Sequence, residues 1–259
     1  MKNIIKIDNV SYKREDNLIL DSVSLKINQG ELVSIIGPSG SGKTSLINIL
    51  LNRVKCNDGK VLIFDNYVVK VLSEFNSSVF VTNRVIDELM FFLKKMKVPD
   101  DEINSRVNFI VNAFHIEDIL DCIPSSLSDG EKIIVSLACI LVTYPDVLVI
   151  DEVFDMIDDI SKDNIFSLLK KLKKENNMTV IFITQNSNDV LYTDRVILLS
   201  CGKLLLDKKI KNAFEDEKLY KSASISFPFI VDLCKKLIYY DLIDKPEFNM
   251  NKLVNKLWK

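Results

Sequence analysis

The sequence lacks several features that would mark particular classes of protein. Its 34 basic and 36 acidic residues nearly cancel, so no overall cationic field favours nucleic acid. It contains no uninterrupted apolar run of about 18 residues, so we predict no membrane-spanning helix and expect a partner to hold the chain at any membrane. We find no internal repeat and no low-complexity linker. With 259 residues, the chain is long enough for one large α/β domain with an appendage, or for two modest domains.

Neither the cysteines nor the single histidine forms a metal-binding pattern in the sequence. The five cysteines include no C-x-x-C pair and several have apolar neighbours, which favours reduced, packed thiols in a cytosolic protein. The lone histidine, His115, has no companion ligand nearby, and we expect a packed or half-exposed side chain. Residues 1–8 break their short apolar run with charge, which makes a poor signal peptide.

A phosphate-binding motif is the most specific feature that is present. Residues 37–44, GPSGSGKT, match G-x-x-x-x-G-K-[ST], between a predicted buried strand at 32–36 and a predicted helix at 45–51. Glycines let backbone N–H groups turn onto phosphate oxygens, Lys43 can reach the β- and γ-phosphates, and the Thr44 hydroxyl can ligate Mg²⁺. The sequence therefore predicts nucleoside triphosphate binding. The predicted nucleotide-binding residues of this segment are Gly37, Pro38, Ser39, Gly40, Ser41, Gly42, Lys43, Thr44 and Ser45.

Apolar patterning predicts further elements around this motif. Alternation favours antiparallel strands at 4–12 and 22–27, and another strand at 59–64. Helical periodicity follows at 85–96, 101–114 and 131–142. Buried parallel strands are predicted at 147–150 and 179–183 with a crossover helix at 162–175, then a hairpin at 196–200 and 203–206. Helical segments beyond 211 are interrupted at 222–228.

A second motif restricts the choice among phosphate-binding proteins. The apolar run 147–150 ends in Asp151 and Glu152, at the carboxyl edge of a predicted parallel strand. There Asp151 can hold the Mg²⁺ shell, and Glu152 can polarise an attacking water. We interpret the pair as catalytic rather than as a solvated strand end.

Residues 127–131, LSDGE, lie between the two motifs and directly before a predicted helix. Here the chain resembles the ATP-binding-cassette (ABC) ATPases, whose signature LSGGQ occupies this position. The resemblance covers nearly the whole chain in order. It implies that Tyr12 stacks on adenine, that 155–158 form the loop after the catalytic Glu152, and that Gln185 stands at the switch position. It also implies that the ATP bound to a second, partner ATPase contacts Ser128, Asp129, Gly130 and Glu131 of this chain.

The tail narrows the resemblance. Residues 212–214 and 225–237 look like the C-terminal element of the energy-coupling-factor (ECF) ATPases, which serve vitamin and metal-ion importers. In that subfamily a Pro-aromatic pair precedes a short helix that helps to hold two ATPases together. We therefore predict an ABC ATPase domain at 1–210, with a helical subdomain at about 85–143, and a helical dimerisation appendage at 211–259.

The chain departs from the family at three places. Its only glutamines are Gln29 and Gln185, so the family's loop Gln is missing, and Glu74, Asn76 and Asn83 are candidates to replace it. Gln185 replaces a His that contacts the γ-phosphate, and an amide cannot carry positive charge. In the signature, Asp129 and Glu131 bring negative charge toward the partner's nucleotide, although Ser128 and Glu131 also form a capping box that explains the helix start. We expect the weaker half of an asymmetric ATPase pair.

The predicted fold is a P-loop NTPase of the ABC type: an antiparallel β subdomain, a parallel-sheet core, a helical subdomain and a C-terminal helical appendage. The predicted function is ATP-driven dimer closure that powers an ECF-type importer, with ATP and Mg²⁺. The predicted partners are a second ABC ATPase, identical or different, and a transmembrane subunit, with no nucleic acid, at the cytoplasmic face of the membrane. The alternatives are a regulatory cassette that binds ATP without hydrolysing it, the ATPase of another ABC transporter class, and a DNA-repair or translation cassette.

Overall fold

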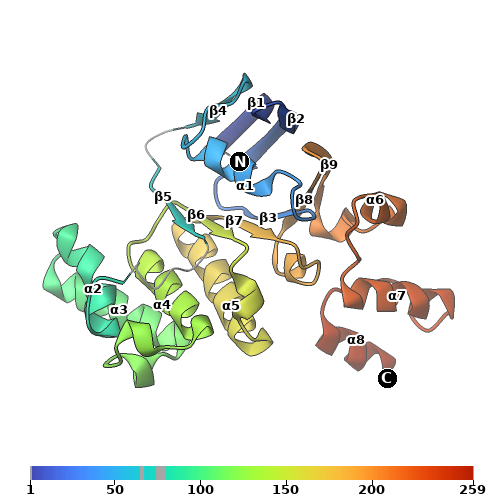
Figure 1. Cartoon of the computed structure of the whole chain (residues 1–259). Helices are drawn as coiled ribbons and strands as arrows, with labels where there is room; N and C mark the ends of the chain where they lie inside the picture. Colours follow the sequence, from blue (N-terminus) through green and yellow to red (C-terminus); the bar gives the residue numbers. More distant parts are fainter. Residues whose placement is uncertain (1, 65–66, 74–79, 259) are drawn as a thin grey trace. The chain divides into compact units, whose positions relative to one another are not determined.

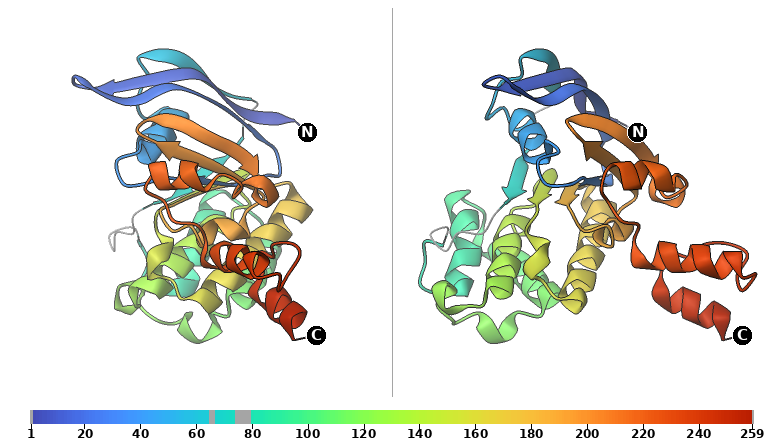
Figure 2. Two further views of the ribbon diagram at one scale, coloured as in Figure 1. Left: turned by 90° about the vertical axis from the view of Figure 1, so that its right-hand side faces the viewer. Right: turned by 45° about the vertical axis from the view of Figure 1, so that its right-hand side comes forward.

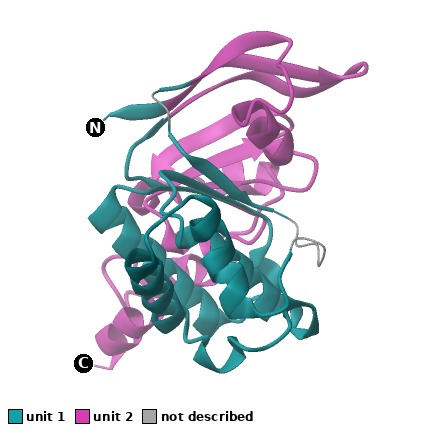
Figure 3. Ribbon diagram, turned by 90° about the vertical axis from the view of Figure 1, so that its left-hand side faces the viewer, with its two compact units in different colours: residues 1–4, 27–32, 63–182 teal, residues 5–26, 33–62, 183–259 magenta. Residues whose placement is uncertain are grey.

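The computed structural model describes residues 2–64, 67–73 and 80–258, which contain both strands and helices (Figure 1; two further views in Figure 2). These residues form two units, each assembled from separate stretches of sequence (Figure 3). The first unit contains 1–4, 27–32 and 63–182, and the second contains 5–26, 33–62 and 183–259. The chain therefore passes from one unit to the other several times.

The first unit joins buried strands to a set of amphipathic helices. The strands β5, β6 and β7 follow one another in that order, and β5 pairs with β6 in parallel. Every side chain of β7 and the first four of β6 are buried, as in strands covered on both faces. The strand β5 is an addition to the predicted elements. The elements described in this unit are β5 (Val69–Leu72), α2 (Val85–Lys95), α3 (Asp100–Phe114), η2 (Glu117–Ile119), η3 (Pro124–Ser126), α4 (Asp129–Leu141), β6 (Val147–Asp151), η4 (Phe154–Met156), α5 (Asp159–Asn176) and β7 (Thr179–Thr184).

The second unit contains a three-stranded sheet, the phosphate-loop helix and the C-terminal helices. The sheet has the order β2-β1-β4; separately, β3 pairs in parallel with β8, which forms an antiparallel hairpin with β9. The predicted strands, the helix after the phosphate loop and the hairpin are confirmed. The elements are β1 (Asn3–Arg14), β2 (Asn17–Asn28), β3 (Leu32–Ile36), α1 (Lys43–Leu50), β4 (Asp58–Ile63), η5 (Asp189–Tyr192), β8 (Arg195–Ser200), β9 (Lys203–Lys209), η6 (Ile210–Asn212), α6 (Glu217–Ser222), α7 (Phe229–Tyr239) and α8 (Met250–Leu257).

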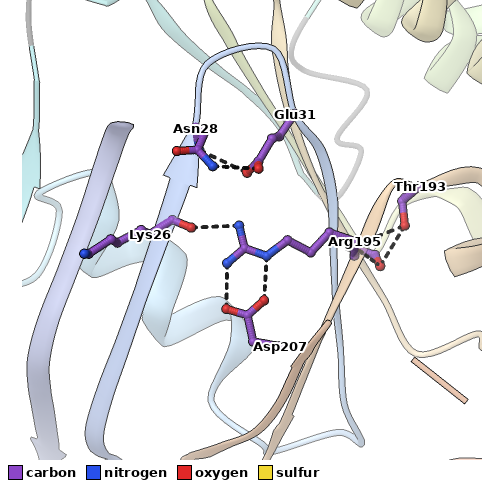
Figure 4. A network of polar contacts seen from close by, with 7 residues as sticks. Lys26, Asn28, Glu31, Thr193, Arg195 and Asp207 are labelled. Atoms are coloured by element: carbon purple, nitrogen blue, oxygen red, sulfur yellow. Dashed lines mark hydrogen bonds and ion pairs between the residues drawn. The ribbon is translucent and has the colours of Figure 1, made fainter. Parts of the chain in front are cut away.

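A two-pronged ion pair fixes the hairpin to strand β2 (Figure 4). Arg195 donates from Nε and Nη2 to the two carboxylate oxygens of Asp207, at 2.5 and 2.6 Å. Its third nitrogen, Nη1, donates to the carbonyl oxygen of Lys26 at 2.9 Å. The side chains of Arg195 and Asp207 are 17% and 27% exposed, so water screens this pair only in part. The guanidinium therefore holds β2, β8 and β9 in one register.

The C-terminal helices share a hydrophobic cluster with strand β8. Val196 and Leu198 of β8 belong to the same buried cluster as Tyr220 of α6, Val231 of α7 and Leu253 of α8. Aromatic rings at the start of this region pack closely: those of Tyr220 and Phe227 have centroids 4.9 Å apart. The division into an ATPase domain and a C-terminal appendage at residue 211 stays a prediction. No helix in the described part of the chain is long and apolar enough to cross a bilayer.

Candidate nucleotide-binding site

The loop between β3 and α1 is shaped by glycines that leave no room for a side chain. A Cβ on Gly37 would lie 2.1 Å from the carbonyl oxygen of Leu199, and one on Gly42 would lie 2.9 Å from that of Ile19. Gly42 also has a φ of 103°, which other residues rarely adopt, and it is the N-cap of α1. The loop is tied to the β8–β9 turn, because the N–H of Gly202 donates to the Ser41 carbonyl at 3.1 Å. The result is a narrow backbone cradle at a helix N-terminus, which is the geometry that binds phosphate.

Lys43 is the cationic side chain of this cradle. It is only 4% exposed, and its Nζ donates to the carbonyl oxygens of Gly37 and Pro38, at 2.8 and 2.9 Å. These contacts hold the ammonium group against the loop itself rather than in solvent. Beside it on the first turn of α1, Thr44 is exposed and Ser45 is half-buried. Tyr12, half-buried on β1, belongs to the same unit.

Asp151 and Glu152 lie at the end of β6 in the first unit. Asp151 is half-buried and is the last residue of the strand, whereas Glu152 is exposed and has a φ of 53°. Such a left-handed backbone is uncommon for a residue with a side chain. The next turn is anchored by Phe154, whose ring lies 5.6 Å from that of Phe166 and 5.2 Å from that of Phe182. The packing thus fixes the turn that carries the two carboxylates.

Residues 128–131 start helix α4 with a reciprocal capping box. The backbone N–H and the hydroxyl of Ser128 both donate to Glu131 Oε2, at 2.8 and 2.6 Å, and Ser128 Oγ accepts from the Glu131 N–H at 3.3 Å. These bonds, the hydroxyl bond first, lower the pKa of Glu131, so its carboxylate is ionised at neutral pH. Asp129 adds a second carboxylate, which lies 3.6 Å from Lys132 Nζ. The predicted cap is confirmed.

The same turn lies against the loop that follows Glu152. A Cβ on Gly130 would be 3.1 Å from the carbonyl oxygen of Met156, so the backbone of α4 approaches that loop closely. The loop ends at Asp158, which caps α5 by accepting from the N–H and hydroxyl of Ser161 at 2.9 and 2.6 Å. The first unit therefore brings residues 128–131 next to residues 155–158.

A relay of hydrogen bonds orders the segment after β7. The N–H of Asn186 donates to Thr184 Oγ1 at 2.9 Å, and the N–H of Asn188 donates to Asn186 Oδ1 at 3.0 Å. Asn188 Oδ1 in turn accepts from the N–H of Phe229, at 2.8 Å. Gln185 is exposed within this segment. Sequence reasoning missed Asn188, because its partner lies 41 residues away and no local pattern links the two.

Comparisons with known proteins identify the family. Residues 20–155 match the family described as ABC transporter. The chain is 31% identical to the energy-coupling factor transporter ATP-binding protein EcfA1 of Oenococcus oeni, over 99% of this chain and 98% of that protein. The chain belongs to the ABC transporter family. Within it, the chain groups with the ATP-binding proteins of energy-coupling-factor transporters.

Two solved structures of this ABC ATPase fold are similar to the chain. One is cbiO1 from Clostridium perfringens, part of the transporter complex cbiONQ, with 25% identity and a TM-score of 0.74 over 86% of this chain and 94% of that one. The other is a bacterial ABC transporter cassette described as dimeric, with 25% identity and a TM-score of 0.68 over 80% and 99%. The predicted fold class, family and ATPase activity are thus confirmed.

The structure divides the predicted site residues of this ABC ATPase between its two units. The phosphate loop, Tyr12 and Gln185 belong to the second unit, and the carboxylates and residues 128–131 belong to the first. Of the candidates for the missing loop glutamine, Glu74 and Asn76 lie outside the described residues, and Asn83 is exposed.

Two further residues differ from what the sequence indicated. Buried Glu88 accepts from the N–H groups of Val81 and Thr82, at 3.1 and 2.9 Å, a role that no pattern predicted. His115 is exposed at the end of α3, with a left-handed φ of 54°, which corrects the expectation of a packed or half-exposed ring.

Proposed function

We propose that the chain is the ATP-hydrolysing subunit of an ECF-type importer of a vitamin or metal ion, and that it works by ATP-driven closure of an ATPase dimer. The observation that carries the proposal is the phosphate cradle, in which Gly37 and Gly42 leave no space for a Cβ and Lys43 is held at the loop. Similarity over nearly the full length of an ECF transporter ATP-binding protein supports the transporter class.

Each site residue has a proposed task. Backbone N–H groups of residues 37–45 and Lys43 bind the phosphates, and Tyr12 stacks on adenine. Thr44 and Asp151 supply a hydroxyl and a carboxylate, which are the hard oxygen donors that Mg²⁺ takes. Glu152 accepts a proton from the attacking water.

Dimer closure would complete each site with residues 128–131 of the opposite ATPase. We propose that this chain is the weaker half of the pair. Gln185 offers an amide where positive charge would help, and ionised Glu131 would face the partner's γ-phosphate. The purified chain alone should therefore be a feeble ATPase, and robust turnover that Glu152→Gln abolishes would contradict this asymmetry.

The C-terminal helices offer a surface that suits an ATPase partner. Large apolar side chains at the ends of α7 and α8 are exposed, among them Tyr239 at 80%, Tyr240 at 69% and Trp258 at 85%. Exposed apolar groups of this kind are typical of protein interfaces. We propose that they contact the second ATPase, while a transmembrane subunit holds the pair at the cytoplasmic face of the membrane.

Calorimetry of nucleotide binding tests the proposed site. Lys43→Ala should abolish ATP binding because it removes the charge that faces the phosphates, whereas Glu152→Gln should bind normally and stop turnover at this site. Lys13→Ala, which changes an exposed lysine of the same unit, is the matched control. Wild-type affinity in Lys43→Ala would refute the assignment. The alternative, a regulatory cassette that closes without hydrolysis, predicts that Glu152→Gln leaves the ATPase rate of the assembled complex unchanged.

A further inference from the structure

The start of helix α7 is capped by the segment after β7 rather than by its own residues. The N-cap residue Pro228 offers no side-chain acceptor, so the N–H of Phe229 depends on an outside partner. That partner is Asn188 Oδ1, at 2.8 Å. An amide oxygen at this place does what a local N-cap side chain does elsewhere. The other two C-terminal helices have local N-caps, since the side chain of Asp216 caps α6 and that of Asn249 caps α8.

Both ends of this hydrogen bond are held firmly. On the helix side, the Phe227 ring packs against Tyr220, and Lys235 Nζ lies 3.9 Å above it. On the strand side, Asn188 is linked back to Thr184 through Asn186, in two hydrogen bonds of 3.0 and 2.9 Å. A displacement of α7 therefore reaches the end of β7 through three successive short contacts.

Gln185 lies inside this linked segment and beside the C-terminal helices. A hollow of about 550 Å³ is lined by Gln185, Asn186 and Asn188, together with Tyr220, Phe227 and Phe229. The space next to Gln185 is thus bounded by the start of α7. Gln185 is exposed at this hollow, on the backbone segment that the hydrogen bonds of Asn186 and Asn188 order.

We propose that Asn188 is a positioning residue: by capping α7 it fixes the backbone around Gln185, so that the placement of the C-terminal helices sets the rate of ATP hydrolysis at this chain's site. The inference rests on the proposed function, since it takes Gln185 as the residue that meets the γ-phosphate. The cap acts on how the switch side chain is oriented in the transition state. It therefore affects kcat more than KM.

Five variants isolate the hydrogen bond from general loosening of the C-terminal region. Asn188→Ala removes the acceptor, and Asn188→Asp retains one. Phe229→Pro removes the donor together with the ring and leaves the helix start intact, because proline suits the first helical position and Pro228, with ψ of 139°, already has the extended backbone that precedes a proline. It is compared with Phe229→Ala, which loses the same ring and keeps the N–H. Asn249→Ala, which deletes the cap of α8, is the matched control for a lost cap without a link to Gln185.

Two measurements are made on the assembled complex, with the partner ATPase's catalytic base removed so that only this chain's site turns over. We expect Asn188→Ala, relative to wild type, and Phe229→Pro, relative to Phe229→Ala, to lower kcat about fivefold, as one lost cap would, with KM for ATP within about twofold. The double variant Asn188→Ala, Phe229→Pro should be no slower than either change alone, because both changes break the same hydrogen bond. Hydrogen exchange at residues 185–189, measured without nucleotide, should be faster in Asn188→Ala and in Phe229→Pro, each against its own reference. The exchange and kcat of Asn188→Asp and Asn249→Ala should match wild type.

Unchanged kcat and unchanged exchange in Asn188→Ala would overturn the inference, and so would an Asn249→Ala variant that is as slow as Asn188→Ala. Failure of the proposed function has a different signature: turnover at this site would not depend on Glu152. In that case the exchange measurement still decides whether α7 holds residues 185–189.

Discussion

Glu131 makes the proposed asymmetry testable with a change of one charge. Its carboxylate closes the capping box of α4, and the two bonds from Ser128 lower its pKa, so it is ionised at neutral pH. The family has a neutral glutamine at this position. Glu131→Gln keeps an acceptor for the Ser128 N–H and hydroxyl, because glutamine also forms capping boxes. The variant therefore changes charge while preserving the start of the helix.

The two effects of the substitution differ in size. Weaker capping and loss of a favourable charge at a helix N-terminus should cost about 0.5 kcal/mol of stability. Two unit charges about 6 Å apart repel by about 0.7 kcal/mol in water and by about 3 kcal/mol at an effective dielectric constant of about 20. Relief of that repulsion on closure corresponds to a rate gain between about threefold and about a hundredfold. The free energy of repulsion that the substitution relieves should thus exceed the free energy of unfolding that it removes.

The assay is steady-state ATP hydrolysis by the assembled complex. This chain also carries Glu152→Gln, so that only the partner's site, which residues 128–131 of this chain complete, turns over. Glu117→Gln, an exposed change of the same charge in the same unit, controls for net charge and should leave the rate unchanged. A rate in Glu131→Gln that is equal to or below that of Glu117→Gln, with helix content intact by circular dichroism, would refute the repulsion argument.

Three further outcomes are expected. Gln185→His should raise turnover at this chain's site while ATP affinity stays within about threefold, because the contact belongs to the transition state; calorimetry and ATPase assays check both, and an unchanged rate would contradict it. Arg195→Lys should lower the free energy of unfolding, measured by urea titration, by about 1–3 kcal/mol, since lysine cannot donate to Asp207 from two nitrogens. The control Arg84→Lys, at a more exposed ion pair, should lower it by no more than about 0.5 kcal/mol. The folded-state pKa of Glu131 is lowered, so its stabilisation is present above the unfolded pKa of about 4.3 and is lost as pH falls through the folded value; thermal melts of wild type and Glu131→Gln should therefore converge in acid.

Local signals carried most of what could be predicted. The phosphate loop followed from glycine spacing, β6 and β7 from short buried runs, and the start of α4 from the Ser128-x-x-Glu131 pattern. In each case the signal lies in a short run of neighbouring residues, even where distant parts of the chain complete the structure. Such features are visible in a single sequence.

Features that depend on distant partners could not be predicted. Strand β5 is only four residues long and mostly half-buried, so it lacks a clear period. The residue before the strand, Val68, is held by a hydrogen bond of 2.7 Å from its N–H to the carboxylate of Asp146, which is 78 residues away. The cap on α7 from Asn188 has the same character. Sequence patterns record which residues are apolar, and they do not record which backbone group a distant side chain will meet.

The altered residues of the signature and the switch segment have different local consequences, and this bears on how an asymmetric ATPase remains folded. Glu131 stabilises the helix that it starts, because its carboxylate accepts hydrogen bonds from Ser128. In the proposed pair, the same charge would oppose an approaching phosphate. Gln185 is exposed beside a hollow, so a histidine there can be exchanged for an amide without a packing cost. Neither residue is at odds with the local structure, and in the proposed function each acts on charge near a nucleotide. In the pair that we propose, Gln185 would slow this chain's own site and Glu131 would oppose closure over the partner's nucleotide, and neither change would cost the chain its fold.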